Sequence, residues 1–402
     1  MSKIDELLKK YCPNGVLQQP MWKLTAWDKK FNAVDNHKQK KVIKYKYLLA
    51  KDLKNLEDSN GVVKLLSTGY YDGYTTEEKA GEYLFEGEIV TIPWGGKAIV
   101  KYYNGKFCTA DNRIATSLDT GVLLNKFLYY YMIDNTSTLQ SFYRGSSIQH
   151  PSMKRVLDMM IPVPKLEVQN EIVRILDNFT ELEAELEAEL EARNKQFQYY
   201  LNSLFEDQIE NSKILSLEEI ADFQYGYTDK AKDIGSARYI RITDILSNGR
   251  LSNDDKKYVE LNDDNQKYLL KKGDVVVART GASFGKVLFF DSGTPSIYAS
   301  YLIKFILDEK LINSRYFWYY TRTNMYWKQA NDLVSTGGQP QFNANVLKKI
   351  TIPLPSLKEQ LRTIELLDKF DLLIGDISVG LPAEIEARKK QYEYYRSKLL
   401  TF

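Results

Sequence analysis

The chain of 402 residues carries the same text twice. The first copy starts as IPVPKLEVQ, continues through LDNF and ends as ELEARNKQFQYY; the second starts as IPLPSLKEQ, continues through LDKF and ends as EIEARKKQYEYY. Between residues 189–200 and residues 384–395, eight of twelve positions are identical. A repeat separated by nearly half the chain predicts two globular units, each followed by a long helix.

Both repeated segments have helical spacing, with apolar residues three, four or seven positions apart. That spacing predicts one helix over residues 166–205 and another over residues 356–402, paired as an antiparallel coiled coil with pseudo-two-fold symmetry. The residues expected at the helix-pair interface are Ile172, Leu176, Phe179, Leu186, Leu190, Phe197, Ile364, Leu367, Phe370, Ile377, Ile385 and Tyr392. Two ordinary amphipathic helices that do not pair are the alternative.

The two copies differ by an insertion. The offset between them is 191 at Leu166 and Leu357 but 195 at Tyr200 and Tyr395, so the second copy has four extra residues, around Gly380-Leu381-Pro382. A proline inside a helix removes a backbone hydrogen bond and clashes with the preceding turn, and four inserted residues unwind a coiled coil locally. We therefore expect a kink or break in the second helix at this point.

Upstream of each helix the text predicts a mixed, strand-rich domain. EGEIVTIPWGG (86–96) and KGDVVVARTGA (272–282) each indicate a turn and a buried β-branched strand that ends in glycines. FLYYYM (127–132) and YFWYYT (316–321) indicate equivalent aromatic helices or strands. The expected fold class is α+β. The expected order is a globular domain over 1–165, a helix over 166–205, a second domain over 206–355 and a helix over 356–402.

Charge is distributed unevenly along the chain. Residues 1–165 contain 24 Lys and Arg against 17 Asp and Glu, a net of +7, whereas residues 166–205 contain 3 against 9, a net of −6. A basic domain suits a polyanion, and an acidic helix suits contact with protein. We expect the stripe Glu181–Glu191 to face the helix partner or another protein rather than the polyanion.

Several classes of protein are disfavoured. No apolar run approaches the length of a membrane span, and the charged N-terminus lacks the apolar core of a secretory signal. Cys12 and Cys108 alone cannot build a disulfide framework, which favours a reducing, cytoplasmic location. The sequence also lacks an N/D-P-P-Y/F methyltransferase motif, a glycine-rich cofactor loop, a Walker A sequence, a helicase box and a nuclease core. With His37 and His150 as its only histidines, we expect no metal, no cofactor and no chemistry of its own.

The whole chain resembles the specificity subunits of type I restriction–modification systems. The resemblance rests on the junctions IPVPKLEVQ and IPLPSLKEQ, the two long helices and the segment GDVVVARTGASFGKV. It implies a non-catalytic reader of double-stranded DNA, with two target recognition domains that contact the two halves of a bipartite, asymmetric site. It also implies that the helices dock two DNA-adenine methyltransferase subunits, and that restriction subunits join the complex. The sequence departs from the family pattern at IPWGGK (92–97), which replaces an arginine-containing turn, and at the GLPA insertion.

The same reading follows from physical arguments. Two domains related by an approximate two-fold axis dock on equivalent faces of a duplex, and different surfaces then read different half-sites. A helix of some forty residues is about 60 Å long, which sets an upper limit of under two turns of B-DNA on the separation of the domains.

Candidate DNA contacts fall in loops of both domains. In the second domain Arg279, Thr280, Gly281 and Lys286 form a glycine-rich loop after a strand, suited to a guanine contact and a phosphate contact. Gln339 and Gln341 in TGGQPQFN correspond to Gln149 and His150 in GSSIQHP, with Arg144 just upstream. Lys97 and the lysines of residues 38–46, Lys38, Lys40 and Lys41 among them, complete the set. For each of these, a solvated turn or loop face is the alternative.

Two other functions compete with the DNA reader. The first is a coiled-coil adaptor that binds protein without DNA specificity, and a mobility shift of a duplex by the free chain separates it from the reader. The second is an enzyme with unrecognised motifs, which methyl transfer by the purified chain would reveal. Self-association of the free subunit is expected if its partner-facing helical surfaces are exposed.

Overall fold

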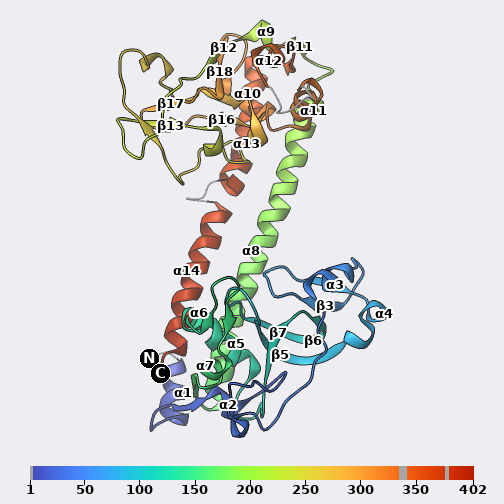
Figure 1. Cartoon of the computed structure of the whole chain (residues 1–402). Helices are drawn as coiled ribbons and strands as arrows, with labels where there is room; N and C mark the ends of the chain where they lie inside the picture. Colours follow the sequence, from blue (N-terminus) through green and yellow to red (C-terminus); the bar gives the residue numbers. More distant parts are fainter. Residues whose placement is uncertain (1–2, 335–341, 376–379) are drawn as a thin grey trace. The chain divides into compact units, whose positions relative to one another are not determined.

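The structure is a computed structural model that describes residues 3–334, 342–375 and 380–402. The chain divides into two compact units, the first made of residues 1–184 and 387–402 and the second of residues 185–386. Both units mix strands and helices, which confirms the α+β prediction (Figure 1). The helix α8 (Leu166–Glu206) follows Pro164 as predicted, and each unit contains part of it.

The first unit is built on a six-stranded sheet. Its strand order is β2-β7-β5-β6-β3-β4, and all neighbours are antiparallel except β3 and β6. The strands are β2 (Thr25–Trp27), β3 (Val63–Leu66), β4 (Gly73–Thr75), β5 (Phe85–Pro93), β6 (Lys101–Thr109) and β7 (Asn112–Ser117). The last five residues of β5 are buried because the strand has a neighbour on each side. The expected buried strand at 86–96 is therefore the centre of this sheet.

The second unit repeats part of that sheet. Its four-stranded sheet has the order β12-β18-β15-β16, and every pair in it is antiparallel, as for β2-β7-β5-β6 in the first unit. A three-stranded sheet, β14-β13-β17, stands beside it in the same unit. The strands are β12 (Ala221–Tyr225), β13 (Ala237–Ile240), β14 (Tyr258–Val259), β15 (Val275–Ala278), β16 (Val287–Phe289), β17 (Ser296–Tyr298) and β18 (Leu302–Leu307). β15 is the buried strand expected at 272–282.

The two aromatic segments are both helices, α5 (Asn125–Asp134) and α10 (Ser314–Tyr320). All five aromatic residues of α10 are buried, because the helix packs between the sheet and α13 (Leu357–Gly375). In the first unit α5 lies against β5 and β6, and its Phe127 and Leu128 share a core with Ile172 and Leu176 of α8. Those two α8 residues, predicted at the helix-pair interface, also belong to the globular core.

Each repeated IPxP motif is a strand that closes its unit. β10 (Met160–Val163) pairs with β1 (Leu17–Pro20), and β19 (Thr351–Leu354) pairs with β11 (Lys213–Ser216), both antiparallel. The proline that follows each strand precedes a helix, where its missing N–H costs nothing. The repeat in the sequence therefore encodes a strand-to-helix junction.

A buried glutamine fixes each junction. In the first unit the Gln169 side chain accepts from the backbone N–H of Leu124 (2.9 Å) and donates to the carbonyls of Val122 (2.7 Å) and Pro164 (2.8 Å). In the second unit Gln360 makes the same three bonds, from Asn313 N–H (2.8 Å) and to Leu311 (2.9 Å) and Pro355 (3.0 Å). These glutamines end the IPxPxLxxQ motif, so the motif preserves a hydrogen-bonded clamp between the helix and the loop before α5 or α10.

The aspartate of LDNF and LDKF forms a second repeated contact. Asp177 accepts from Lys126 (2.8 Å) and from the hydroxyl of Tyr130 (2.5 Å). Asp368 accepts from Arg315 (2.6 Å) and from the hydroxyl of Tyr319 (2.6 Å). Each long helix is thereby bonded to the aromatic helix of its own unit through one cation and one tyrosine.

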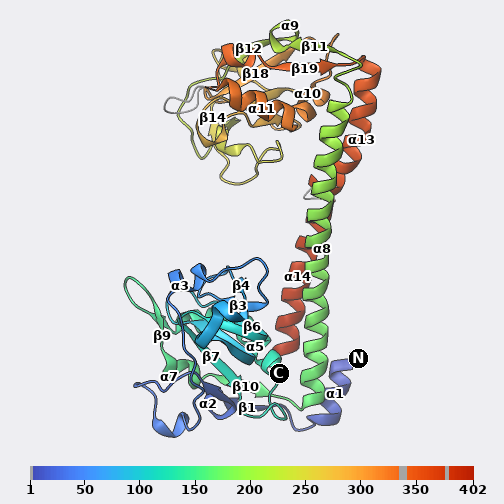
Figure 2. The same ribbon diagram turned by 90° about the vertical axis from the view of Figure 1, so that its right-hand side faces the viewer.

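The helices pair antiparallel inside each unit. In the first unit Phe179 of α8 stacks on Tyr395 of α14 (Leu381–Leu400), with ring centroids 5.6 Å apart. In the second unit Phe370 of α13 lies against Tyr200 of α8, with centroids 5.4 Å apart. Figure 2 shows α13 beside the last turns of α8. Phe179 corresponds to Phe370 and Tyr200 to Tyr395, so the contacts are reciprocal, as in an isologous interface.

The other predicted interface residues are placed as follows. Leu190, Phe197, Ile364 and Leu367 pack in the core of the second unit, Ile385 is buried, Leu186 is half-buried, and Tyr392 packs against the core of the first unit. Ile377 lies outside the described residues. The segment predicted at 356–402 is two helices, α13 and α14, and α14 begins at Leu381 with Pro382 in its first turn. The break expected around Gly380-Leu381-Pro382 explains the division, since proline is tolerated only at a helix start.

Shorter elements complete the two units. In the first unit these are α1 (Lys3–Tyr11), α2 (Met21–Leu24), η1 (Asn36–Lys38), α3 (Ala50–Asn55), α4 (Glu77–Ala80), η2 (Gly81–Tyr83), α6 (Thr136–Ser141), β8 (Tyr143–Arg144), β9 (His150–Pro151) and α7 (Met153–Leu157). In the second unit they are α9 (Leu217–Ile220), η3 (Ile242–Asp244), η4 (Gln266–Tyr268), η5 (Gly281–Ser283), α11 (Asn324–Leu333) and α12 (Ala344–Leu347). Over the described part of the chain, no helix has both the length and the apolar character that a membrane span requires.

Candidate nucleic-acid interface

In the first unit, the turn after β5 and the β8–β9 hairpin come together. The Tyr143 hydroxyl donates to the Pro93 carbonyl (2.9 Å), and the Gly96 N–H donates to the Gln149 carbonyl (2.9 Å). His150 Nδ1 lies 2.7 Å from the Trp94 carbonyl oxygen, which can only accept, so Nδ1 carries the proton. These bonds hold the turn of residues 94–97 and the hairpin as one surface.

Four of the predicted residues lie on this surface. Arg144 stands opposite His150 in the β8–β9 register, and Lys97, Arg144, Gln149 and His150 are all exposed. Within the described residues, neither Lys97 nor Arg144 has an ion-pair partner. Gly145, at φ +143°, makes the tight hairpin possible, because a Cβ there would lie 2.3 Å from the Ile148 carbonyl oxygen. The surface therefore combines free cations with the amide and imidazole groups that read base edges.

Trp94, which the sequence analysis did not single out, lies at the centre of the same surface. Cations stand near its indole face: Lys29 at 5.3 Å and the Arg113 guanidinium at 5.0 Å from the ring centroid. The His150 ring is also close, 5.2 Å away between centroids. Arg113 is buried and pairs with Asp28 (2.9 Å) and with Asp111. Burial raises the pKa of the Asp28 carboxyl, and the Arg113 charge opposes that rise. The sequence feature that could have identified Trp94 is its position between a proline and two glycines.

The lysines of residues 38–46 do not act as one group. The Lys38 side chain is only 17% exposed and its ammonium pairs with Asp158 at 2.5 Å, and Lys46 pairs with Glu82. Within the described ranges, Lys40, Lys41 and Lys44 have no ion-pair partner. The segment is held by the buried Gln39, whose side chain accepts from the Phe31 N–H and donates to the Phe31 and Val34 carbonyls. Only part of the predicted basic ribbon is therefore available to a polyanion.

A second loop of the first unit presents exposed aromatic side chains that the sequence analysis missed. Tyr70 is 83% exposed and Tyr71 is 63% exposed. A nearly buried ion pair holds the loop, since Lys101 bonds Asp72 (2.5 Å) and the Ser67 carbonyl (2.9 Å). Asp72 in turn accepts from the Ser67 N–H (2.9 Å). The signal in the sequence was an adjacent pair of tyrosines between glycines, in STGYYDG.

In the second unit, Arg279 leaves the end of β15 and lies between two tyrosine rings. Its guanidinium carbon is 5.4 Å from the Tyr225 centroid and 5.5 Å from the Tyr301 centroid, and its Nε donates to the Ser300 carbonyl (3.0 Å). The Arg279 carbonyl also accepts from the Phe342 N–H (2.9 Å). Arg279 is thus oriented by its neighbours and half-buried, while its two terminal nitrogens have no acceptor among the described residues.

Backbone conformation and close packing explain why this loop contains glycines. Thr280 precedes η5, and Gly281 has φ +70°. Gly285 has φ +76°, and a Cβ on it would lie 2.9 Å from the Trp327 ring. Lys286 follows Gly285 and lines a pocket beside α8. Gln339 and Gln341, predicted beside this loop, lie outside the described residues.

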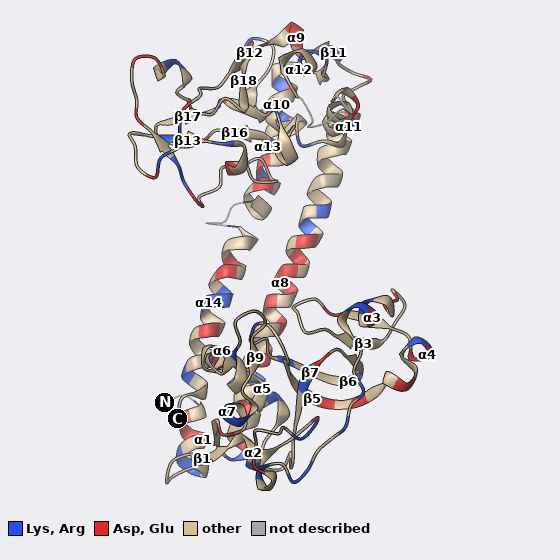
Figure 3. Cartoon of the chain, in the orientation of Figure 1, with Lys and Arg blue, Asp and Glu red and all other residues tan. Residues whose placement is uncertain are grey.

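Residues of the acidic stripe of α8 form ion pairs with α14 and with other residues of α8 itself. Glu183 pairs with Lys389 of α14 (3.4 Å), Glu189 with Arg193 (2.7 Å) and Glu191 with Lys195 (2.6 Å). In Figure 3 the red segments along the middle of α8 mark its Asp and Glu residues. Among the described residues, no cluster of His, Cys, Asp or Glu could hold a metal ion.

The family model and the related proteins that match this chain all point to one family. A family model described as the type I restriction modification DNA specificity domain matches residues 35–192 and again 209–387. A putative type I restriction enzyme specificity subunit of Haemophilus influenzae is 32% identical over 349 residues, which cover 83% of this chain and 88% of that protein. A specificity subunit of a type I restriction enzyme from Escherichia coli is 31% identical, over 72% of this chain and 74% of its own length.

A solved structure shares the fold. The crystal structure of the type I restriction–modification S subunit of M. genitalium has a TM-score of 0.60 to this chain and 17% sequence identity. The match covers 97% of each chain. The two matches to the family model, which include most of both units, and the similarity to the Haemophilus influenzae protein show that the chain belongs to the family of type I restriction–modification DNA specificity subunits.

Proposed function

We propose that this chain is the non-catalytic, DNA-reading subunit of a cytoplasmic restriction–modification complex. Its target is double-stranded DNA with two different half-sites, one for each unit. The observation that carries the proposal is the contrast inside the repeat. The clamps at Gln169 and Gln360 are the same, whereas the turn after β5 is centred on Trp94 and the loop after β15 on Arg279. Equal frames with unequal loops favour two recognition surfaces of different specificity.

The recognition domains in this proposal are residues 1–165 and 206–355, and 166–205 and 356–402 are the helical regions. The first reads DNA with Lys97, Arg144, Gln149 and His150, with Lys40 and Lys41 on phosphates. The second uses Arg279, Thr280 and Gly281 on bases and Lys286 on phosphate, with Gln339 and Gln341 beside them. Lys38 is assigned a smaller part, because its ammonium is already paired with Asp158.

The helices are proposed to dock two DNA-adenine methyltransferase subunits, with restriction subunits joining the complex. Two features support this. The repeated QxxYY segments leave one tyrosine of each pair well exposed, Tyr199 in α8 and Tyr394 in α14. The Escherichia coli relative is itself named as a subunit of a restriction enzyme. Without these partners, the same surfaces favour self-association of the free chain.

The proposal is tested by selection from a pool of randomised duplex DNA with the purified full chain, at low and at moderate salt. The expected result is two short, different motifs at one spacing. If the chain binds duplexes that share no motif, the proposed sequence-specific recognition of DNA is overturned. A chain that binds no duplex at any salt, yet captures a methyltransferase subunit, would favour the coiled-coil adaptor instead.

A further inference from the structure

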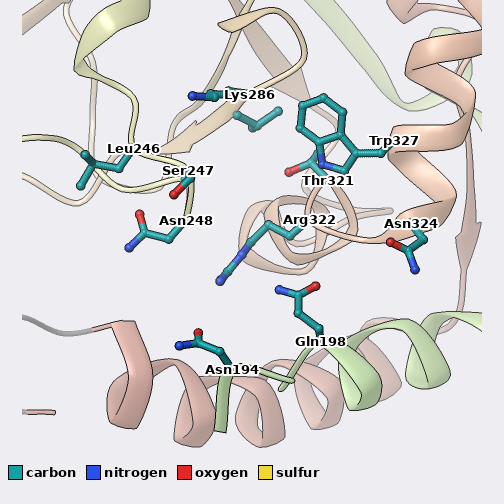
Figure 4. A pocket seen from close by; sticks show the side chains of 12 residues that line it. Asn194, Gln198, Leu246, Ser247, Asn248, Lys286, Thr321, Arg322, Asn324 and Trp327 are labelled. Atoms are coloured by element: carbon teal, nitrogen blue, oxygen red, sulfur yellow. The ribbon is translucent and has the colours of Figure 1, made fainter. Parts of the chain in front are cut away.

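A polar pocket of about 390 Å³ lies in the second unit beside the second half of α8 (Figure 4). The helix contributes Asn194 and Gln198, the turn of residues 246–249 contributes Asn248, and Lys286 and Arg322 complete the polar wall. Two of the lining residues are cations, and none is Asp or Glu. The composition of the wall therefore favours an anion.

The charges behind the wall do not cancel. Arg322 bonds Asp371 at 2.9 Å and Arg250 bonds the same carboxylate at 2.5 Å. Asp371 is 1% exposed and the Arg322 side chain is 12% exposed. One buried carboxylate thus serves two guanidiniums, which leaves one positive charge over. The Arg250 side chain is 34% exposed and is reached by water, whereas the more shielded Arg322 would gain from a counter-charge in the pocket.

The donors of the wall are only partly engaged: the Asn194 amide donates one bond to the Leu190 carbonyl (2.9 Å). The Asn248 side-chain oxygen accepts from the Arg250 N–H (3.1 Å), which turns its amide NH₂ away from that bond. Lys286 has no ion-pair partner in the described part of the chain. Figure 4 shows the Arg322 guanidinium directed into the space among Asn194, Gln198 and Asn248. The Arg322 guanidinium and the amides of Asn194, Gln198 and Asn248 therefore face one space, and Lys286 lines the same pocket.

The pocket is held open by its own frame. The turn of residues 246–249 is closed by a bond from the Gly249 N–H to the Leu246 carbonyl (3.0 Å). Gly249 has φ +75°, and a Cβ on it would lie 2.6 Å from the Trp318 indole nitrogen. Arg322 is stacked over the rings of Trp318 (4.7 Å) and Phe197 (4.8 Å). Little reorganisation is needed for a ligand to enter.

We propose that this pocket binds a phosphate group. Phosphate offers several acceptor oxygens and suits recognition by Arg together with Lys and amide donors. The phosphate group is a backbone phosphate of the duplex that the second unit reads. This choice of source rests on the proposed function. A free nucleotide or inorganic phosphate carries the same chemistry, and the experiment separates the two sources.

The first arm of the test is calorimetric titration of the full chain with inorganic pyrophosphate at constant ionic strength. Asn248→Asp keeps the acceptor for the Arg250 N–H and places a negative charge in the pocket, so we expect it to weaken binding by about tenfold or more. Lys286→Gln removes a charged donor and is expected to weaken binding by several-fold. Asn211→Asp and Lys310→Gln make the same charge changes outside the pocket and are expected to bind as the wild type does.

The second arm measures duplex binding over a range of salt concentrations. Lys286→Gln should lower the slope of log affinity against log salt by about 1, as loss of one phosphate contact requires. An unchanged slope with lost pyrophosphate binding would overturn the DNA source and leave a small phosphate ligand. No pyrophosphate binding, or equal binding by Asn248→Asp, would overturn the pocket. A chain that binds no duplex would refute the DNA reader, yet the pyrophosphate arm would still decide the pocket.

Discussion

The two units share their frame and differ in their surface. In both, a glutamine clamps the start of a long helix, an aspartate bonds a cation and a tyrosine of the aromatic helix, and a phenylalanine meets a tyrosine of the antiparallel helix. The loops that follow β5 and β15 have no such correspondence. The first is built on Trp94 and the second on Arg279.

The difference between the shared frame and the unlike surfaces shows that the repeat preserves buried contacts. Hydrogen bonds made by Gln169 and Gln360 are buried and directional, so replacement leaves backbone groups without partners. The turns at 94–97 and 279–286 are mostly half-buried or exposed, so many of their side chains can change with less harm to the core. The chain therefore has two domains on one plan with different surfaces, as the proposed reader of two unlike half-sites requires.

The largest expected effect comes from the clamps. Gln169→Leu and Gln360→Leu should each lower the free energy of unfolding of their own unit by roughly 3 kcal/mol or more, because one N–H and two carbonyls lose their buried partners. Hydrogen-exchange mass spectrometry reads the two units separately. Asn170→Leu, one residue further along α8 and exposed, is the matched control. A large loss in one unit and none in the other would show that the clamps are not equivalent.

Arg279→Ala and Arg144→Ala test the separation of the two surfaces. Each should cost about 1–3 kcal/mol of binding free energy and relax specificity only in the half-site of its own unit. The measurement is the affinity for duplexes in which one half-site at a time is scrambled. Equal loss on every sequence would instead assign these arginines to phosphates, and loss in both half-sites would break the comparison.

The reciprocal aromatic contacts should be energetically equal. Double-mutant cycles with alanine for Phe179 with Tyr395, and for Phe370 with Tyr200, are expected to give coupling energies of about 0.5–1.5 kcal/mol each. The cycles are read from unfolding of the corresponding unit. Coupling confined to one pair would mean that the antiparallel contact is structural in one unit only.

The lysines of the first unit sharpen the comparison further. Lys41→Gln should lower the salt slope of duplex binding by about 1, whereas Lys38→Gln should leave it unchanged, because the Lys38 ammonium is engaged by Asp158. Anisotropy titrations between low and moderate salt measure both slopes. Equal slopes for both variants and the wild type would remove this segment from the DNA interface.

The smallest expected effect is an acid sensitivity of the first unit alone. Hydrogen bonds from Arg174 and Lys3 hold the pKa of Glu171 at about 2, below its ordinary 4.5, and the corresponding residue in the second unit is Arg362. A lowered carboxyl pKa stabilises the fold above pH 4.5, and that contribution disappears as the pH falls toward 2. Glu171→Gln should cost up to about 1 kcal/mol at pH 7, because the partners are exposed, and nothing near pH 2. A constant difference between wild type and variant over this range would exclude the ion pair as the cause.

The sequence predicts a structural feature of this chain best when that feature occurs in both copies of the repeat. The helix after Pro164, the break at Pro382 and the buried strands β5 and β15 all follow from periodicity and local chemistry, and the structure confirms them. The clamps did not follow, although Gln169 and Gln360 end the repeated motif, because a sequence does not say which loop a side chain will reach. Trp94 and Tyr70 were missed for another reason: each stands once, without a counterpart in the other copy.

The candidate contacts show the same limit. Side chains distant in sequence, such as Lys97, Arg144 and His150, come together through backbone bonds that no spacing rule predicts. Lys38 looked equivalent to Lys40 and Lys41 until its partner Asp158, 120 residues away, was known. Site residues therefore depend on tertiary contacts, whereas the frame depends on a pattern that is written twice.

The most direct test of the central claim is a map of methylated adenine made with the full complex. The chain is expressed with a type I methyltransferase subunit in cells that lack other adenine methylation, and modified positions are read by single-molecule sequencing. We expect one split motif with two different halves at a constant gap, and with Arg279→Ala we expect only one half to be relaxed. A palindromic or continuous motif, or relaxation of both halves, would contradict the claim that two units on one frame read two different sequences.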